Sequence, residues 1–222
     1  MTRRVTSGTP EPRPALTRDR VVRAAVDLIE RDGTRALSMR AVAAELGVAV
    51  MSLYNHVPNK AALLEGVAEH VVAGMDLTGD PAEHWTDRAR ALARAFRKTA
   101  HDYPRCMTIV LTHKVDGTVG LRMAESAFAI AHDAGFDAPT AVRITRALMA
   151  YTLGAQLRDA GMAEVLDRHP DGLFAARELD PTRFPNVLAA GDELARSDPE
   201  GDFEFGLDLL LGAVDALPRQ VT

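Results

Sequence analysis

Two short helical patterns that meet at a single glycine constrain this chain more than any other feature. Ser38 can cap the first pattern, over residues 39–46; Gly47 ends it, and the second pattern covers residues 49–55. A tight turn sets such helices steeply apart, so the second can enter a DNA major groove about 12 Å wide while the first packs behind it. The stretch therefore predicts a helix-turn-helix, with a plain helical hairpin as the alternative.

The rest of the sequence also follows helical spacing, and no segment alternates as a strand would. Apolar residues recur at helical intervals, while Gly33, Pro104 and Gly135 mark helix ends. The pattern predicts helices over 18–32, 60–75, 82–101, 105–112, 119–134, 139–160, 185–196 and 201–217, with one or two helical turns at 161–168 and a loop at 169–185. The expected fold class is therefore all-α, with nine or ten helices.

Charge is unevenly distributed along the chain. Residues 1–60 hold 10 Lys and Arg against 6 Asp and Glu, a net of +4, whereas the remaining residues hold 16 against 25. A basic front on an acidic body suggests a first part that faces a polyanion, although chance clustering on a solvated surface gives the same pattern. Residues 1–16, with three prolines and Arg3, Arg4 and Arg13, predict a disordered basic arm. Such an arm can lie along DNA phosphates or enter a minor groove, or it can equally be an idle tail.

Several classes of function lack their sequence signatures. No segment has 18 uncharged apolar residues, the first 20 residues lack the apolar core of a signal peptide, and Cys106 is the single cysteine. These observations predict a soluble, cytoplasmic protein without a membrane partner. The seven histidines are scattered, and no nucleophile elbow, phosphate-binding loop, dinucleotide-binding motif or zinc-binding motif occurs. We therefore expect neither an enzyme nor a metal or cofactor site.

The N-terminal sequence resembles the DNA-binding domain of the tetracycline-repressor (TetR) family. The resemblance is carried by "LSMRAVAAELGV" (37–48) and "LYNHVPNKAALL" (53–64), and more thinly by "HWTDRARALARAFR" (84–97), "AHDAGF" (131–136), "YTLGAQL" (151–157) and "FEFGLDLLL" (203–211). It implies a helix-turn-helix DNA-binding domain at 17–62, followed by an effector-binding and dimerisation domain at 63–222. It also implies a homodimeric transcriptional repressor that binds a palindromic operator on double-stranded DNA and leaves it when a small molecule binds.

The DNA contacts of the family carry over to matching positions of this chain. By this resemblance Arg40 would reach a base edge or a phosphate, since arginine can donate two hydrogen bonds to guanine. The positions expected to contact the DNA backbone are Ser38, Ser52, Tyr54, His56 and Lys60. The two serines can donate to phosphates at helix N-termini, where the helix dipole favours an anion. Ser38 can equally be a helix cap and Tyr54 a core residue.

Three positions of the second short helix depart from the tetracycline-binding members of the family. Val50 and Met51 stand where those proteins have polar or turn-forming residues, and Asn55 stands in place of an indole. Val50 and Met51 can contact the C5 methyl group of thymine, and Asn55 can bond to an adenine edge or a phosphate. The expected operator therefore differs from the tetracycline operator and places thymine methyls under this helix.

The C-terminal half departs from the pattern that binds tetracycline with magnesium. The magnesium-binding imidazole of the family falls near Val110, with His113 as the closest histidine. The resemblance thus implies a pocket for a largely hydrophobic effector, aromatic or polyketide-like, and not for tetracycline with magnesium. The expected lining residues are Met75, Leu92, Phe96, Val110, Met123, Tyr151 and Gln156, any of which could instead be plain core.

Two predicted helices, at about 140–158 and 201–217, match those that form the dimer bundle of the family. Their expected interface residues are Leu148, Leu153, Leu157, Phe205, Leu209 and Leu210, and the alternative role for each is intramolecular core. Two alternatives to an effector-controlled repressor stay open. One is a helical DNA-binding protein without a small-molecule effector, and the other is an activator.

Overall fold

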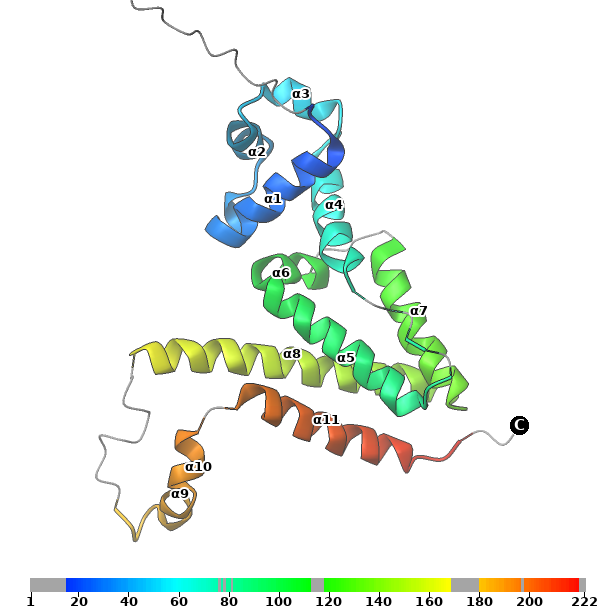
Figure 1. The fold of residues 1–222 in the computed structure, drawn as a ribbon, viewed down its shortest axis with the longest axis vertical. Coiled ribbons are helices and arrows are strands. Elements are labelled where there is room, and N and C mark those ends of the chain that lie inside the picture. The colour runs from blue at the N-terminus through cyan, green and yellow to red at the C-terminus, as the bar shows by residue number, and fades with distance from the viewer. Residues whose placement is uncertain are drawn as a thin grey trace, which may run out of the picture. The chain divides into compact units, whose positions relative to one another are not determined.

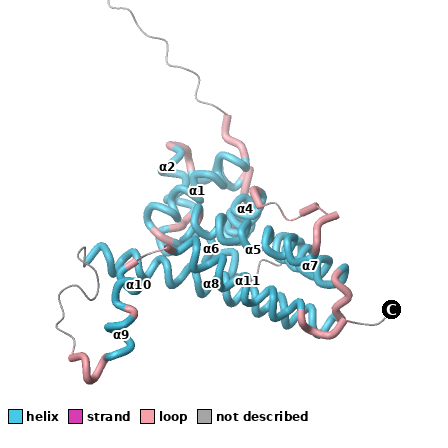
Figure 2. The backbone as a smooth tube through the Cα atoms, turned by 60° about the horizontal axis from the view of Figure 1, so that its bottom comes forward, coloured by secondary structure: helices cyan, strands magenta, loops and turns pink. Residues whose placement is uncertain are grey.

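The computed structural model describes residues 15–219 except 76, 78, 81, 113–117, 169–179 and 197, and this part contains helices and no strand (Figures 1 and 2). The all-α prediction is confirmed. Contacts between backbone positions divide the chain into two compact units, residues 1–70 and 71–222, with the division inside a helix. The predicted basic arm lies, apart from its last two residues, outside the described residues.

The first unit is built from short helices with well-defined ends. Its elements are α1 (Arg18–Asp32), the 3-10 turn η1 (Thr34–Ala36), α2 (Met39–Leu46), α3 (Val50–Tyr54) and α4 (Lys60–Ala73), whose last turn belongs to the second unit. The Thr17 hydroxyl caps α1 by accepting a hydrogen bond from the Arg20 amide. Gly33, with a φ of 86°, ends that helix in a conformation that disfavours other residues.

The core of the first unit forms where α1 meets the shorter helices. The buried face of α1 includes Val22 and Ile29, and Leu53 of α3 and Leu63 of α4 are fully buried as well. Gly66 allows α4 to approach α1 closely, because a Cβ atom at this position would lie 2.7 Å from the Val22 Cγ2. The sequence of α4 is therefore constrained by packing at this glycine rather than by backbone conformation.

The second unit packs its longest helices side by side (Figure 1). Its elements are α5 (Trp85–Asp102), α6 (Pro104–Thr112), α7 (Thr118–Asp133), α8 (Ala138–Arg168), α9 (Pro185–Ala189), α10 (Gly191–Ala195) and α11 (Pro199–Asp215). Helix α8 packs against α5, α7 and α11, and α5 also packs against α6, α7 and α11. This arrangement leaves one face of α8 directed at α5 and α7 and another at α11.

Aromatic residues join the helices of the second unit at one end. Trp85 meets Phe136 edge to face, with ring centroids 5.6 Å apart, and its indole N–H donates to the Asp215 carboxylate at 3.0 Å. The Arg219 guanidinium lies 3.8 Å from the Phe136 ring centroid and donates a hydrogen bond to Asp215. Residues from the start of α5 and the end of α11 are therefore fixed to each other.

The structure corrects two of the predicted boundaries. Residues 161–168 continue α8 as one helix, because the single Gly161 costs only about 1 kcal/mol relative to alanine and good helix formers surround it. The helix predicted at 185–196 is two short helices, because Ala190 has φ −94° and ψ 3° and interrupts the helical backbone. The loop predicted at 169–185 lies largely outside the described residues.

No helix in the described part of the chain combines the length and the apolar run needed to cross a bilayer.

Candidate functional site

The turn between α2 and α3 has the geometry that the sequence pattern predicts. Gly47 has a φ of 64°, and its amide and that of Val48 donate to the carbonyls of Ala44 and Ala43 at 3.1 and 3.0 Å. These bonds satisfy carbonyl groups that the end of α2 would otherwise leave without partners, and they release the chain sharply into α3. The Ser38 hydroxyl caps the other end of α2 by accepting from the Ala41 amide at 3.1 Å.

The two faces of this helix pair differ in burial. Met39, Val42 and Ala43 of α2 and Leu53 of α3 are buried, so they hold the pair to α1. The residues expected to touch DNA lie on the outside: Ser38, Arg40, Met51, Tyr54, Asn55 and Lys60 are exposed, and Val50, Ser52 and His56 are half-buried. These nine residues are called the α2–α3 surface below. Met51, at 74%, is one of the most exposed large apolar side chains in the described part of the chain.

Lys60 has a role within the protein that the sequence did not reveal. Its Nζ donates to the main-chain carbonyl of Leu37 at 2.8 Å, across 23 residues. Leu37 immediately precedes the cap of α2 and is buried, so this bond fixes the start of α2 relative to the start of α4. An ammonium group carries three donors, which leaves two that can serve a phosphate.

Ion pairs fix the helices behind this surface. The Arg31 guanidinium of α1 donates two hydrogen bonds of 3.0 Å to the Glu45 carboxylate of α2, and this contact lowers the pKa of Glu45 from its ordinary value. Arg18 pairs with Glu69 of α4 at 2.8 Å. Sequence reasoning missed both pairs, because residues 14 and 51 positions apart meet only through the tertiary fold.

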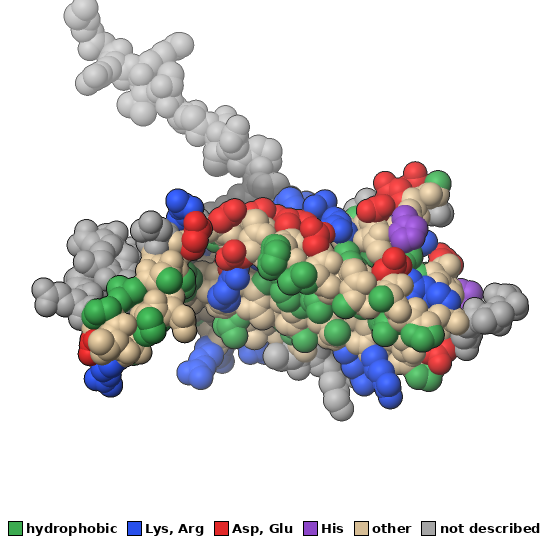
Figure 3. Space-filling model, turned by 90° about the horizontal axis from the view of Figure 1, so that it is seen from below, with side chains coloured by type: hydrophobic (Ala, Val, Ile, Leu, Met, Phe, Trp, Pro, Cys, Tyr) green, Lys and Arg blue, Asp and Glu red, His purple; other side chains and the backbone are tan. Residues whose placement is uncertain are grey.

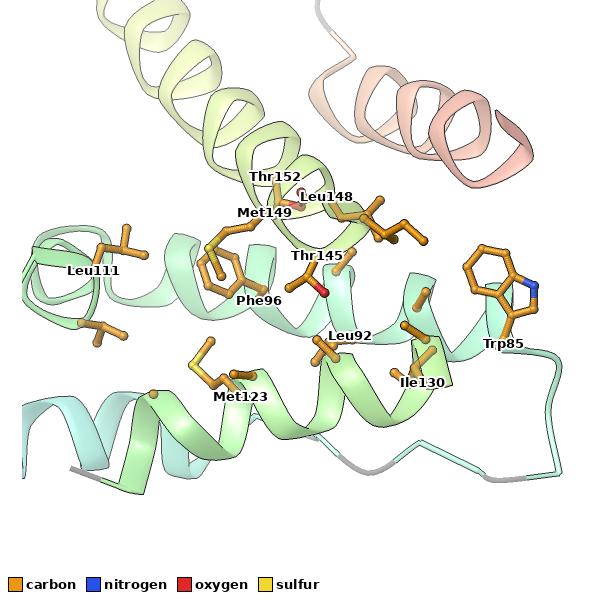
Figure 4. A pocket seen from close by; sticks show the side chains of 18 residues that line it. Trp85, Leu92, Phe96, Leu111, Met123, Ile130, Thr145, Leu148, Met149 and Thr152 are labelled. Carbon is orange, nitrogen blue, oxygen red and sulfur yellow. Dashed lines mark hydrogen bonds between the residues drawn. The ribbon is translucent and has the colours of Figure 1, made fainter. Parts of the chain in front are cut away.

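The second unit contains an apolar cavity of about 400 Å³ between α5, α6, α7 and α8 (Figure 4). The described residues that line it are Trp85, Ala89, Leu92, Ala93, Phe96, Val110, Leu111, Gly120, Met123, Ala124, Ala127, Ile130, Ala131, Ile144, Thr145, Leu148, Met149 and Thr152. None of them carries a charge, the only side-chain hydroxyls are those of two threonines, and the indole N–H of Trp85 is already bonded to Asp215. The volume is in the range of sites that bury drug-sized molecules, and such sites are usually apolar with a few polar groups.

Four of the expected ligand-binding residues line the cavity and three do not. Leu92, Phe96, Val110 and Met123 come together there from α5, α6 and α7. Tyr151 faces α11 instead: its ring stacks on Phe203, and its hydroxyl donates to the Phe203 carbonyl at 2.7 Å.

Met75 and Gln156 are the other two expected residues that do not line the cavity. Met75 is buried elsewhere, and the Gln156 amide donates to the Ala100 carbonyl of α5 at 3.4 Å. His113 lies outside the described residues. The α8 residues that line the cavity are Ile144, Thr145, Leu148, Met149 and Thr152, and the last four stand at positions i, i+3, i+4 and i+7. Their helical spacing is the signal by which this stripe could have been found.

The residues expected at a dimer interface fall into two groups. Leu157, Phe205 and Leu209 are 76, 68 and 60% exposed, and Leu153 and Leu210 are half-buried. Leu148 differs, because it packs against the core of the second unit and lines the cavity. Figure 3 shows apolar side chains gathered along the face on which α11 lies, between charged groups. Leu157, Phe205 and Leu209 are called the α8–α11 patch below.

A network of ion pairs connects α11 to α5 next to this patch. Arg94 donates to both oxygens of Glu204, at 2.6 and 2.8 Å, and this hydrogen bonding holds the pKa of Glu204 below its ordinary value. Arg97 of α5 pairs with Asp159 of α8 at 2.8 Å and lies 4.5 Å from the ring centroid of Phe203. The exposed apolar groups are thus presented on helices whose positions are fixed.

No group of three or more side chains suited to holding a metal ion occurs among the residues that the structure describes.

Comparisons with known proteins agree with both halves of this description. The family model for bacterial regulatory proteins of the tetR family matches residues 21–67, and the model for the tetracyclin repressor-like C-terminal domain matches residues 78–217. An HTH-type transcriptional regulator from Saccharopolyspora erythraea is 31% identical, over 92% of this chain and 86% of that protein. The HTH-type transcriptional repressor DrrR1 from Streptomyces coeruleorubidus is 28% identical, over 94% and 81%.

A solved structure shares the fold over nearly the same length. It is that of the transcriptional regulator SCO7222, a TetR from Streptomyces coelicolor, which is 31% identical and has a TM-score of 0.76. The match covers 92% of this chain and 100% of that structure.

Proposed function

Because the chain belongs to the TetR family of bacterial transcriptional regulators, we propose that it is a ligand-responsive repressor whose homodimer binds a palindromic operator. A small, largely apolar effector releases it. Its relatives are transcriptional regulators, so the prediction that the chain is not an enzyme is confirmed. The relative DrrR1 is named as a repressor, which supports repression over activation. Residues 17–62 form the DNA-binding domain, and residues 63–222 bind the effector and dimerise.

The observation that carries this proposal is the presence, in one chain, of the α2–α3 surface and the apolar cavity. The first presents hydrogen-bond donors and exposed apolar groups on a helix pair fixed by a glycine turn. The second is a pocket of about 400 Å³ with an apolar lining, a size and composition typical of small-molecule sites. Together they supply a DNA contact and a small-molecule site, as a ligand-controlled regulator requires.

On the DNA side, the residues divide by the kind of contact they make. Ser38, Ser52, Tyr54, His56 and Lys60 donate to phosphate oxygens, which fixes the position of the protein on the duplex without reading its sequence. Arg40 contacts a base edge or a phosphate, and Val50, Met51 and Asn55 read the bases. The exposure of Met51 supports this role, because a thymine methyl would cover an apolar side chain that now faces water.

On the effector side, the lining argues against tetracycline with magnesium. That ligand carries a metal ion and several polar groups, whereas the described lining offers no imidazole and no carboxylate. Val110 supplies an isopropyl group where an imidazole would be needed. A largely apolar effector fits such a lining because it gains free energy on leaving water and leaves no polar group unpaired.

Dimerisation rests on the α8–α11 patch. Its three large apolar side chains are 60% exposed or more, and an exposed apolar patch of this kind is a feature of protein–protein interaction surfaces. A second copy of the chain would bury this patch through a two-fold symmetric contact. The α3 helix of that copy would then enter the next major groove of a palindromic site.

The test is release from DNA. Operator fragments recovered by selection are bound to the protein, and a panel of apolar and polar compounds is added in a gel-shift assay. We expect some apolar compounds to release the DNA and to raise the melting temperature of the free protein with increasing concentration. If no compound does either, the alternative of a DNA-binding protein without an effector replaces this proposal. An activator would still release DNA but would raise transcription of the adjoining gene.

A further inference from the structure

The cavity contains little that could hydrogen-bond to a ligand, and this narrows the chemistry of the effector. Among its described lining residues, Thr145 and Thr152 alone carry hydroxyl groups, both belong to α8, and the indole N–H of Trp85 is already used in its bond to Asp215 (Figure 4). The other side chains are aliphatic, aromatic or thioether groups. An inference about the chemistry of the effector rests on the proposed function, in which this cavity is the effector site.

The two threonines differ in what they can offer. The Thr152 hydroxyl donates to the Leu148 carbonyl of its own helix at 2.9 Å, so its proton is already used. The Thr145 hydroxyl makes no hydrogen bond with any residue of the described part of the chain. Figure 4 shows the Thr145 side chain directed from α8 toward Leu92, across the space that the cavity residues surround. Thr145 therefore keeps both a donor and an acceptor for a bound molecule.

We propose that the effector is an uncharged, mainly carbocyclic molecule with one carbonyl or hydroxyl oxygen that hydrogen-bonds to the Thr145 hydroxyl. The Thr145 hydroxyl selects for that oxygen and sets the orientation of the molecule between α5, α7 and α8. The rest of the molecule contacts Trp85, Phe96, Met123 and their apolar neighbours.

The same lining argues against a charged group on the bound molecule. An ionised carboxylate or ammonium in the cavity would lose its hydration, and the described lining offers no opposite charge and only one free hydroxyl in return. A neutral oxygen loses much less hydration free energy on leaving water, and one hydrogen bond to the protein compensates for that loss. A neutral ketone should therefore bind far more tightly than a carboxylate of the same skeleton.

The fluorescence of Trp85 can be used to detect binding in the cavity, because Trp85 is the single tryptophan of the chain and lines the cavity. Three probes share one skeleton: tetralin has no oxygen, 1-tetralone has one carbonyl, and tetralin-1-carboxylate carries a negative charge. Calorimetric titration of the full-length protein gives their dissociation constants, and the change in Trp85 emission places each molecule in the cavity. The variants are Thr145→Val, which removes the hydroxyl at nearly constant volume, and Thr145→Ser, which keeps it.

We expect Thr145→Val to weaken binding of 1-tetralone about fivefold or more and to leave that of tetralin nearly unchanged. Thr145→Ser should restore the preference for the ketone. Thr152→Val, the matched change on the same helix, should leave the ratio of the two affinities unaltered. Tetralin-1-carboxylate should bind about a hundredfold more weakly than 1-tetralone, or not at all.

Each other outcome overturns the proposal in a specific way. An unchanged ketone preference in Thr145→Val, with far-UV circular dichroism showing an intact fold, would remove Thr145 from its role. Tight binding of the carboxylate would contradict the neutral ligand. If the protein selects an operator but binds neither tetralin nor 1-tetralone, this inference fails while the DNA-binding function stands. If it selects no operator, the proposed function itself fails.

Discussion

At the scale of single residues, the α2–α3 surface combines polar donors with exposed apolar groups. Leu53 is fully buried and holds α3 in place, whereas Met51, two positions earlier, is exposed. A groove-facing helix would gain little from an exposed methionine unless it met an apolar group on DNA. The C5 methyl group of thymine is the apolar feature of the major groove.

Replacing thymine by deoxyuridine at the contacted position tests this role of Met51. Loss of one methyl contact should weaken binding about fourfold, which corresponds to burial of one methylene-sized group. Met51→Ala should weaken binding to the thymine operator and make it insensitive to the replacement. Fluorescence anisotropy with labelled duplexes measures both. A deoxyuridine penalty of equal size in Met51→Ala would assign the methyl contact to another residue.

Lys60 should contribute one phosphate contact as well as its bond to Leu37. Lys60→Ala should weaken operator binding at low salt and reduce the slope of log K against log salt by about 1. Lys98, a lysine of α5 that pairs with Asp102, provides the control, since Lys98→Ala should leave the slope unchanged. A slope unaltered in Lys60→Ala would mean that the residue only positions α2.

At the scale of helices, the close contact of α4 with α1 depends on Gly66. A Cβ atom there would lie 2.7 Å from a methyl group of Val22, whose χ1 angle has little freedom in a helix. Gly66→Ala should therefore destabilise the protein by about 1–3 kcal/mol despite the better helix propensity of alanine. A Cβ atom at Gly74, just after α4, would meet no packing neighbour within 4 Å, so Gly74→Ala should be neutral. Denaturant titrations compare the two; equal stabilities would contradict the packing argument.

Helix positions could be predicted from sequence, but which face of a helix meets which neighbour could not. Thr17 and Ser38 cap α1 and α2, and the Asn59 side chain accepts a hydrogen bond from the Ala62 amide at the start of α4 at 2.8 Å. Such caps act locally, so these three helices begin where the pattern places them. Tyr151 was expected to line the pocket because of the resemblance of the C-terminal half to the family. It faces α11 instead, since the rotation of α8 is set by contacts with Phe203, 52 residues away in the sequence.

The cavity illustrates the same limit. Leu92, Phe96, Val110 and Met123 were found through family resemblance at single positions, whereas Thr145 has no such precedent in the sequence. Its importance depends on being the threonine without a hydrogen bond inside an apolar space, and such a property exists only after folding. Composition and periodicity describe an apolar stripe; they do not say whether that stripe meets other side chains or a void.

At the scale of the whole molecule, binding to a palindromic operator requires two copies of the chain. Static light scattering should give about 48 kDa, twice the 24.0 kDa of one chain. Leu157→Glu places a charge in the α8–α11 patch and should yield a monomer with unchanged helicity and greatly weakened operator binding. Leu121 of α7 is 71% exposed, nearly as much as Leu157, so Leu121→Glu is the matched control and should stay dimeric. A wild-type mass of 24 kDa at micromolar concentration would contradict a dimer with two DNA-binding domains.

The most direct test of operator recognition is selection of binding sites from a random pool of double-stranded DNA by the unmodified protein. A dimeric repressor of this kind should enrich one palindromic sequence, with half-sites about one helical turn apart and thymines in each half. A pool that stays random after repeated rounds at moderate salt, or that yields only a single half-site, would contradict the proposal that a dimer of this chain binds a palindromic operator.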